Sequence, residues 1–137
     1  MLFQQAHTLM RNMLTGRQIL ALGAVLAGIA VAIGAFGAHM LRPILSERMM
    51  EVFETAVRYH MFHAFALLFS GWAYAQYESK IFRNAAWAFV LGIVFFSGSL
   101  YVLALSDTRW LGAITPLGGL FFLMGWVWLA IGFLRRP

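Results

Sequence analysis

The sequence predicts an all-α integral membrane protein, a bundle of four transmembrane helices forming a single domain over residues 1–137. Hydrophobic residues make up 62% of the chain and charged residues only 11%, against about 45–50% and about 25% in soluble domains. A soluble chain of this length exposes much of its surface to water, and too few polar side chains are present here to cover it. In addition, four apolar segments each reach the roughly 20 residues that a membrane-spanning helix needs.

These four segments define the predicted helices. Strands of a membrane barrel would appear as alternating segments of about 10 residues, and the sequence has none. A polar segment over residues 1–17 precedes the first helix, and the short connectors leave no room for a second domain. The predicted transmembrane helices cover residues 19–41, 52–74, 85–105 and 110–134.

The charges outside these helices predict their orientation. With four spans, both termini and the middle connector lie on one side of the membrane, where basic residues are opposed only by Glu78. Basic residues on the other side are balanced by acidic ones. Because basic residues accumulate on the cytoplasmic side, we expect both termini in the cytoplasm. The first set is Arg11, Arg17, Lys80, Arg83, Arg135 and Arg136, and the second is Arg42, Arg48 and Arg109, with Glu47, Glu51 and Asp107.

Several classes of function are disfavoured by what the chain lacks. Its formal charge is +5, but the basic residues are scattered singly or in pairs, without the patch that nucleic-acid binding requires. There is no cysteine, and therefore no disulfide, thiolate metal site or cysteine nucleophile. The Ser97-Gly98-Ser99 segment is not a nucleophile elbow, and the glycine pairs lack the lysine of a P-loop. We therefore expect a protein that is not an enzyme and has no catalytic residues.

Small residues recur at helical spacing in the first and fourth predicted helices. Helices in lipid associate closely where small residues let their backbones approach. We interpret these positions as helix-packing sites rather than a cofactor groove. They are Gly23, Ala27 and Gly34 in the first helix and Gly118 and Gly125 in the fourth.

Polar side chains from all four predicted helices lie toward the ends away from the termini. Such groups are costly within a membrane and suggest a functional site. Tyr59 and His63 are one helical turn apart, on a face predicted to point into the bundle. The candidate outer-leaflet cluster consists of His39, Tyr59, His60, His63, Ser97, Ser99, Tyr101 and Thr115.

Three readings of this cluster are open. The histidines can hydrogen-bond other helices and fasten the bundle. They can bind a metal or haem, since neutral imidazole is a common ligand, although zinc would need a third ligand such as His39 beside His60 and His63. They can also form a quinone or proton-handling site, because histidine titrates near neutral pH. The sequence names no cofactor or metal.

Glu54 and Arg58 form a second polar feature. They are four residues apart, the spacing of an ion pair on one helical face, and this face is rotated by well over 90° from His63. We predict an intramembrane ion pair that neutralises itself at the outer interface, with contact to a partner subunit as the alternative.

Four motifs in order resemble a known family. They are Gly-Ala-Phe-Gly-Ala-His at 34–39, Phe-Glu-Thr-Ala-Val-Arg-Tyr-His-Met-Phe-His at 53–63, Phe-Ser-Gly-Ser-Leu-Tyr at 96–101 and Thr-Pro-Leu-Gly-Gly at 115–119. Over residues 19–134 they resemble the DUF423 family of small inner-membrane proteins. The resemblance implies a four-helix protein of a bacterial inner (plasma) membrane and implies no activity.

Three hypotheses of function follow. The first is a non-enzymatic accessory or assembly subunit of a membrane complex, surrounded by lipid and associating with other membrane subunits or with a second copy of itself. The second is a small proton-linked transporter or channel using His39, Tyr59 and His63, with the Glu54–Arg58 pair as a possible addition, although no repeated halves are evident. The third is binding of a metal, haem or quinone at the outer cluster.

Overall fold

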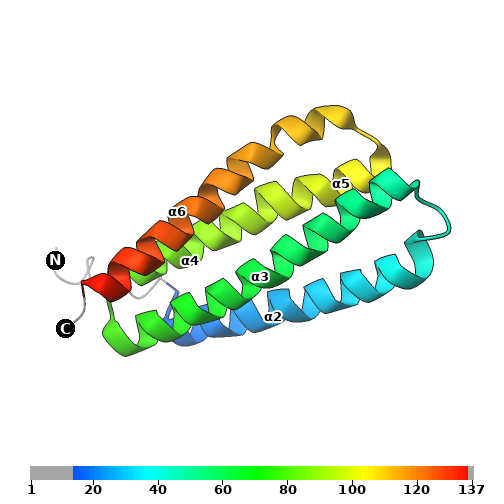
Figure 1. The fold of residues 1–137 in the computed structure, drawn as a ribbon. Coiled ribbons are helices and arrows are strands. Elements are labelled where there is room, and N and C mark those ends of the chain that lie inside the picture. The colour runs from blue at the N-terminus through cyan, green and yellow to red at the C-terminus, as the bar shows by residue number, and fades with distance from the viewer. Residues whose placement is uncertain (1–13, 136–137) are drawn as a thin grey trace, which may run out of the picture.

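The computed structural model describes residues 14–135, and every regular element in this range is a helix (Figure 1). The predicted all-α fold is therefore confirmed. Residues 1–13 and 136–137, which include Arg11, Arg136 and most of the predicted polar segment 1–17, lie outside the described residues. The elements form four helical rods: α2 (Gly16–Phe36) with η1 (Gly37–Leu41); α3 (Glu47–Tyr77); α4 (Lys80–Gly92) with η2 (Ile93–Gly98) and α5 (Ser99–Ser106); and η3 (Arg109–Ala113) with α6 (Thr115–Leu134).

Capping residues set the ends of the first two rods. The hydroxyl of Thr15 accepts a hydrogen bond from the backbone N–H of Gln18 at 3.3 Å, and Ser46 caps α3 in the same way through Met49 at 3.3 Å. Such caps satisfy backbone donors that have no partner within the helix. They extend α2 and α3 beyond the apolar residues that marked the predicted helices, so α3 begins at Glu47 rather than at residue 52.

Left-handed residues end the second and third rods. Glu78 and Asp107 have φ of 50° and 52° and stop α3 and α5, respectively. The residues after them begin the next rod almost at once, so these connectors reverse the chain within very few residues. Figure 1 shows the connectors after η1 and α5 at one end of the molecule and the α3–α4 connector at the other.

Three of the four rods are long and apolar enough to cross a membrane. They are Gly16–Leu41, Lys80–Ser106 and Arg109–Leu134, of 26, 27 and 26 residues. The remaining rod, α3, has 31 residues but is more polar, with Glu51, Glu54 and Arg58 in its first turns. Composition and length therefore identify three candidate spans among the four rods.

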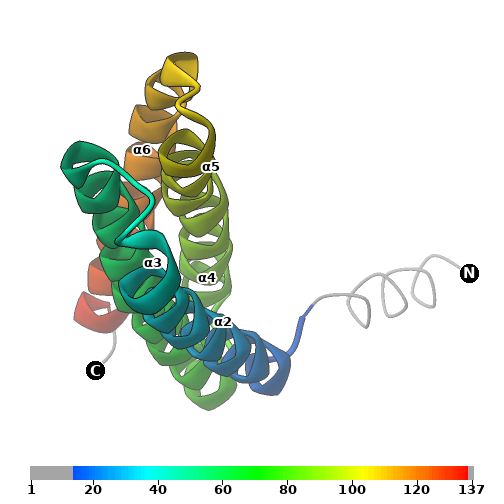
Figure 2. The same cartoon turned by 90° about the vertical axis from the view of Figure 1, so that its right-hand side faces the viewer.

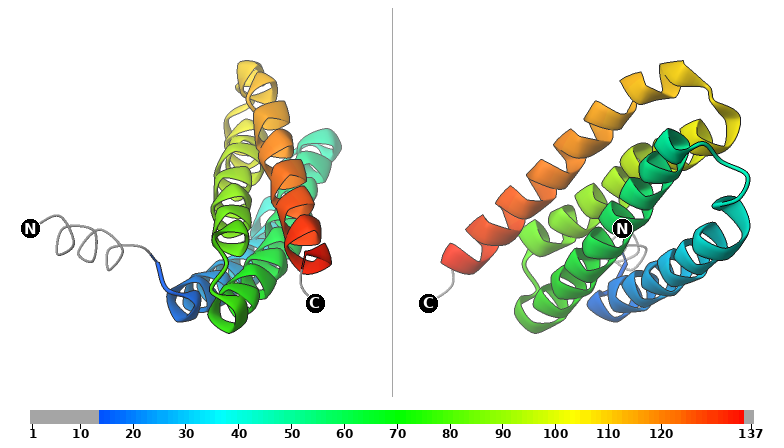
Figure 3. Two further views of the ribbon diagram at one scale, coloured as in Figure 1. Left: turned by 90° about the vertical axis from the view of Figure 1, so that its left-hand side faces the viewer. Right: turned by 45° about the vertical axis from the view of Figure 1, so that its right-hand side comes forward.

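The rods pack antiparallel and in chain order (Figures 1 and 3). α2 packs on α3, α3 packs on α4, η2 and α5, and α6 packs on α4 and η2. Within residues 14–135, α2 and α6 share no extensive contact. The predicted bundle is therefore open at its edges, as the view onto the connectors after η1 and α5 shows (Figure 2).

The small residues predicted to pack in the first helix lie along α3. A Cβ atom on Gly23 would lie 2.9 Å from Cγ of Leu68, and one on Gly34 would lie 3.2 Å from Cγ1 of Val57. Ala27 is half-buried beside them. Larger side chains at the two glycines would hold α2 away from α3.

The corresponding glycines of α6 lie against the third rod. A Cβ on Gly125 would lie 2.5 Å from the ring of Phe89. One on Gly118 would overlap the backbone of Phe95 and Phe96 in η2. Backbone-to-backbone approach of this kind requires glycine at position 118, because no side chain there can turn aside.

Candidate functional site

Two π-helical turns overlap two of the motif segments singled out from the sequence. η1 shares residues 37–39 with the 34–39 segment, and η2 shares residues 96–98 with the 96–101 segment. In η1 the N–H of Arg42 donates to the carbonyl of Gly37 at 3.2 Å, five residues back. Such wide turns are rare overall, and those that occur are often found at functional sites. The turn in η2 carries Ser97, which is fully buried.

His63 of α3 has hydrogen-bond partners on both ring nitrogens. Its Nδ1 lies 2.6 Å from the carbonyl oxygen of Tyr59, and Nε1 of Trp126 donates to its Nε2 at 3.2 Å. The indole is only a donor and the carbonyl only an acceptor. These contacts assign neutral His63 with its proton on Nδ1, donated to Tyr59 within α3, while the bond from Trp126 to Nε2 links α6 to α3.

Aromatic rings enclose His63. Its ring stacks on Phe122 with centroids 3.4 Å apart and planes 8° apart, and Phe89 and Trp126 lie 5.8 and 6.0 Å away. The side chain is only 5% exposed. His63 is thus a buried, stacked and fully hydrogen-bonded group at the meeting of α3, α4 and α6.

His60 lies one turn away and faces the third rod. Its Nδ1 is 3.1 Å from the hydroxyl of Tyr101, and the residue is 3% exposed. The backbone of Leu26 on α2 faces the ring without the geometry of a hydrogen bond, so Nε2 has no partner among the described residues. His60 therefore joins α3 to α5 through one nitrogen.

The serines of the third rod differ from each other. Ser99 and Thr115 share a hydrogen bond of 2.8 Å that joins the start of α5 to the start of α6, and Ser99 also donates to the carbonyl of Phe96 at 3.0 Å. The hydroxyl of Ser97 is buried without a partner among residues 14–135. The predicted cluster therefore forms separate pairs across neighbouring rods.

The last two predicted members of the cluster, His39 and Tyr59, differ in their relation to this interior. His39 is exposed. It lies two residues after Gly37, which packs on Phe53, so its side chain projects to roughly the opposite side of the helix. Tyr59 is 39% exposed, but its ring stacks with that of His63 at a centroid distance of 5.9 Å and lies tilted against Phe96 at 4.6 Å, so it borders this interior as the face predicted from its spacing to His63 implies. The prediction that His39 joins His60 and His63 in one site is wrong.

The predicted ion pair of Glu54 with Arg58 is also corrected by the structure. Glu54 accepts a hydrogen bond from Nη2 of Arg42 at 3.0 Å, and the two side chains are 45% and 66% exposed. The chain reversal between η1 and α3 brings Arg42 over the first turns of α3, where it binds the carboxylate. An exposed pair of this kind contributes about 0–1 kcal/mol.

A metal centre does not assemble from the histidines in the described range. Within residues 14–135, no three histidine or acidic side chains gather closely enough to hold an ion. The unpartnered Nε2 of His60 is a single nitrogen, whereas a structural zinc site takes four protein ligands and a catalytic one three. The arrangement is suited to holding helices together through neutral hydrogen bonds.

Sequence reasoning missed Trp126, which completes the partners of His63. The sequence did indicate that Trp126 needs a partner, because an indole N–H inside an apolar span requires an acceptor. No polar side chain lies beside Trp126 in the sequence of α6, so the acceptor had to come from another helix. Arg42 was missed as the partner of Glu54 because the two residues are 12 apart and meet only through the chain reversal.

The contacts described above define a helical membrane protein whose intramembrane polar groups connect neighbouring rods. The chain belongs to the DUF423 family, described as a protein family of unknown function, whose model matches residues 33–119. That range contains all four motif segments, so the resemblance stated from the sequence is confirmed.

Individual relatives agree with this assignment. A UPF0382 membrane protein of Staphylococcus haemolyticus is 48% identical over 80% of this chain and 89% of its own length. YwdK of Bacillus subtilis, also a UPF0382 membrane protein, is 43% identical over 80% of this chain and 90% of its own. The UPF0382 inner membrane protein YgdD of Escherichia coli is 39% identical over 89% and 93%. The predicted location in a bacterial inner (plasma) membrane is confirmed, and no solved structure matches the chain.

Proposed function

We propose that the chain crosses the membrane four times and acts as a non-enzymatic subunit that associates with other membrane helices. The path of the chain supports the fourth crossing. α2 and the third rod run in the same direction, each starting at the end where α6 finishes (Figure 1). If both cross the membrane, the chain must return between them, and α3 is the only segment connecting them.

The composition of α3 is compatible with this crossing. Its charged residues lie in the first turns, at the connector end, and residues 59–77 contain none. With 31 residues and about 1.5 Å of rise per residue, it exceeds the roughly 30 Å hydrocarbon core. Its polar histidines are shielded by the neighbouring rods. The basic residues Arg17, Lys80, Arg83 and Arg135 share the other end and support cytoplasmic termini.

Association is supported by the outward face of α2. Ala24, Gly28, Ala32 and Ala35 are exposed and lie within about 80° of one another around the helix, on the side opposite α3. A Cβ on Gly28 would have no atom within 4 Å. Small residues in this spacing let a second helix approach closely in lipid. This second small-residue face, which no residue within 14–135 covers, is the observation on which the proposal rests.

The polar interior supports a role without catalysis. His63, Ser99, Thr115 and Tyr101 are engaged with one another or with Trp126 and His60 in bonds between rods. A catalytic histidine would need a nucleophile or a proton donor arranged around a substrate. Here the partners of His63 are a carbonyl and an indole, neither of which can be activated in that way.

The four-span arrangement predicts a labelling pattern. The chain has no cysteine, so single cysteines can be placed at exposed positions by Ile44→Cys, Gly112→Cys and Gln76→Cys. We expect a membrane-impermeant maleimide to label the first two in intact cells and the third only after the membrane is opened. Labelling of Gln76→Cys together with Ile44→Cys in intact cells would contradict a crossing by α3.

The association face predicts the effect of enlarging Gly28. Gly28→Leu is expected to abolish recovery of partner chains when the protein is affinity-purified in native lipid particles, because the approach surface becomes bulky. Val25→Leu, on the flank of the same helix, is the matched control and should leave recovery unchanged. Recovery of this chain with itself alone, in the unmodified protein, would contradict a role as an accessory subunit.

A further inference from the structure

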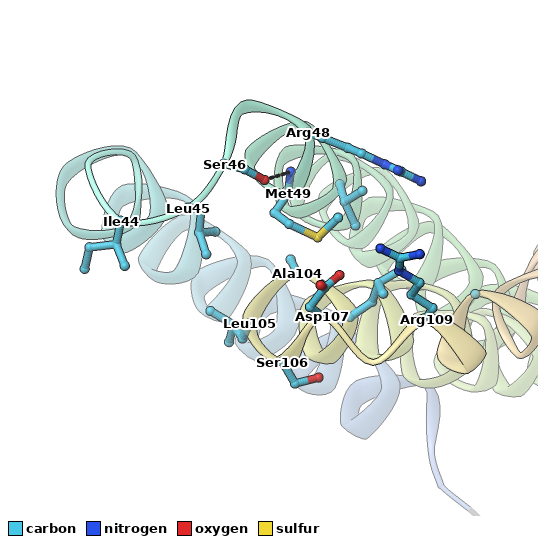
Figure 4. Close-up of a pocket in the computed structure, with 13 residues that line it drawn as sticks. Ile44, Leu45, Ser46, Arg48, Met49, Ala104, Leu105, Ser106, Asp107 and Arg109 are labelled. Atoms are coloured by element: carbon cyan, nitrogen blue, oxygen red, sulfur yellow. Dashed lines mark hydrogen bonds between the residues drawn. The ribbon is translucent and has the colours of Figure 1, made fainter.

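A cleft of about 670 Å³ opens at the end of the molecule that holds the connectors after η1 and α5 (Figure 4). It lies between the start of α3 and the junction of α5 with η3. Leu45, Met49 and Leu103 form part of an apolar wall, whereas Arg48, Asp107 and Arg109 line it with charge. The cleft therefore combines an apolar surface with a polar rim. Apart from the Ser46–Met49 cap of α3, its lining is separate from the hydrogen-bonded pairs described above.

The charge of the rim favours an anion. Two guanidinium groups extend from α3 and η3, and one carboxylate opposes them (Figure 4). Within residues 14–135, Arg42 has an ion-pair partner, Glu54, whereas Arg48 and Arg109 have none within 4.0 Å. Two arginines without internal partners on one cleft leave their donors available to a bound group.

The position of the cleft indicates where that group comes from. The candidate span Lys80–Ser106 ends, and the span Arg109–Leu134 begins, within the lining of the cleft. At the same end Trp110 is 66% exposed and Ile44 is 74% exposed, and tryptophan is enriched at the membrane–water interface. The cleft thus lies where two candidate spans meet the membrane surface, which is the level of the lipid headgroups.

We propose that this cleft binds a glycerophospholipid through its phosphate. The planar fork of donors on Arg48 and Arg109 matches phosphate oxygens, and the apolar wall receives the upper part of an acyl chain. Inorganic phosphate would use the rim alone and leave the wall uncovered. The inference does not depend on which side of the membrane the cleft faces, nor on the association proposed for α2.

Native mass spectrometry of the full chain in detergent, titrated with dioleoylphosphatidylglycerol, tests the proposal. We expect one retained lipid, with an affinity that falls about tenfold in Arg48→Gln and in Arg109→Gln, because each loses a charged hydrogen bond. The matched controls are Arg17→Gln and Arg135→Gln, exposed arginines at the opposite end, which should bind as the unmodified protein does. Unchanged retention in Arg48→Gln and Arg109→Gln would overturn the proposal.

Two further probes separate the possible sources of the phosphate. Dioleoylglycerol, which has the acyl chains but no phosphate, is expected to show no binding that depends on the arginines. Inorganic phosphate at equal concentration is expected not to displace the lipid. Equal binding of dioleoylglycerol would reduce the cleft to an apolar surface, and displacement by inorganic phosphate would assign the rim to a soluble anion; either result overturns the lipid assignment.

Discussion

Gly118→Val is expected to separate α6 from η2 and to lower the free energy of unfolding by about 3 kcal/mol or more. A Cβ at this position would lie 2.7 Å from the backbone carbon of Phe95 and from Cα of Phe96, and closer still to the backbone nitrogen of Phe96. Backbone atoms cannot rotate away as a side chain can, so a whole helix must shift. Thermal unfolding of the purified protein, followed by circular dichroism in detergent, measures the loss.

Gly28→Val is the matched control for this prediction. It introduces the same side chain in the middle of a helix, at a position where a Cβ meets no atom within 4 Å. We expect its unfolding midpoint to stay close to that of the unmodified chain. Gly118→Ala supplies an intermediate case if the valine variant does not fold. Equal midpoints for Gly118→Ala and Gly28→Val would contradict the close approach of α6 and η2.

His63→Ala is expected to lower the free energy of unfolding by about 1–3 kcal/mol, since it leaves the indole N–H of Trp126 without the acceptor of its part-buried hydrogen bond. It also removes the ring stacked on Phe122 at 3.4 Å. Thermal unfolding in detergent measures the effect. His39→Ala provides the control, because that histidine is exposed and its loss should change stability by less than about 0.5 kcal/mol.

A double-mutant cycle isolates the bond between α3 and α6. The effects of His63→Ala and Trp126→Phe should fall short of additivity by about 0.6 kcal/mol, the average coupling of hydrogen bonds between membrane helices, with about 1.7 kcal/mol as the upper end. Strict additivity would mean that the 3.2 Å contact between the indole and the imidazole does not contribute to stability.

The chemistry of the polar residues follows from how they are paired. A histidine held between a carbonyl and an indole is fixed in one neutral tautomer, so it connects rods without needing a counter-ion in lipid. The same residue types, free on the face of a cavity, would be suited to proton transfer or metal binding. Their pairing therefore supports the proposed structural role over a chemical one, which composition alone could not do.

Some features of the candidate site were predictable because they depend on short stretches of sequence. Glycines at helical spacing predicted which positions of α2 pack closely on another helix, and polar residues at matching depths predicted that His60, Tyr101, Ser99 and Thr115 lie near the same level. The pairs themselves were not predictable. Which of several hydroxyls meets which imidazole depends on rotation and vertical offset of whole helices, and the π-helical turns η1 and η2 change both.

The sequence by itself determined the all-helical fold, the approximate extents of the four rods and the membrane as solvent, because apolar length and composition are local properties that act directly on transfer into lipid. The tertiary structure alone decided that the rods form an open row, that His39 lies outside the interior, and that Glu54 binds Arg42 and His63 binds Trp126. Each of these depends on contacts between residues far apart in the chain, which form only when the connectors and the glycine contacts have set the distance and rotation between helices.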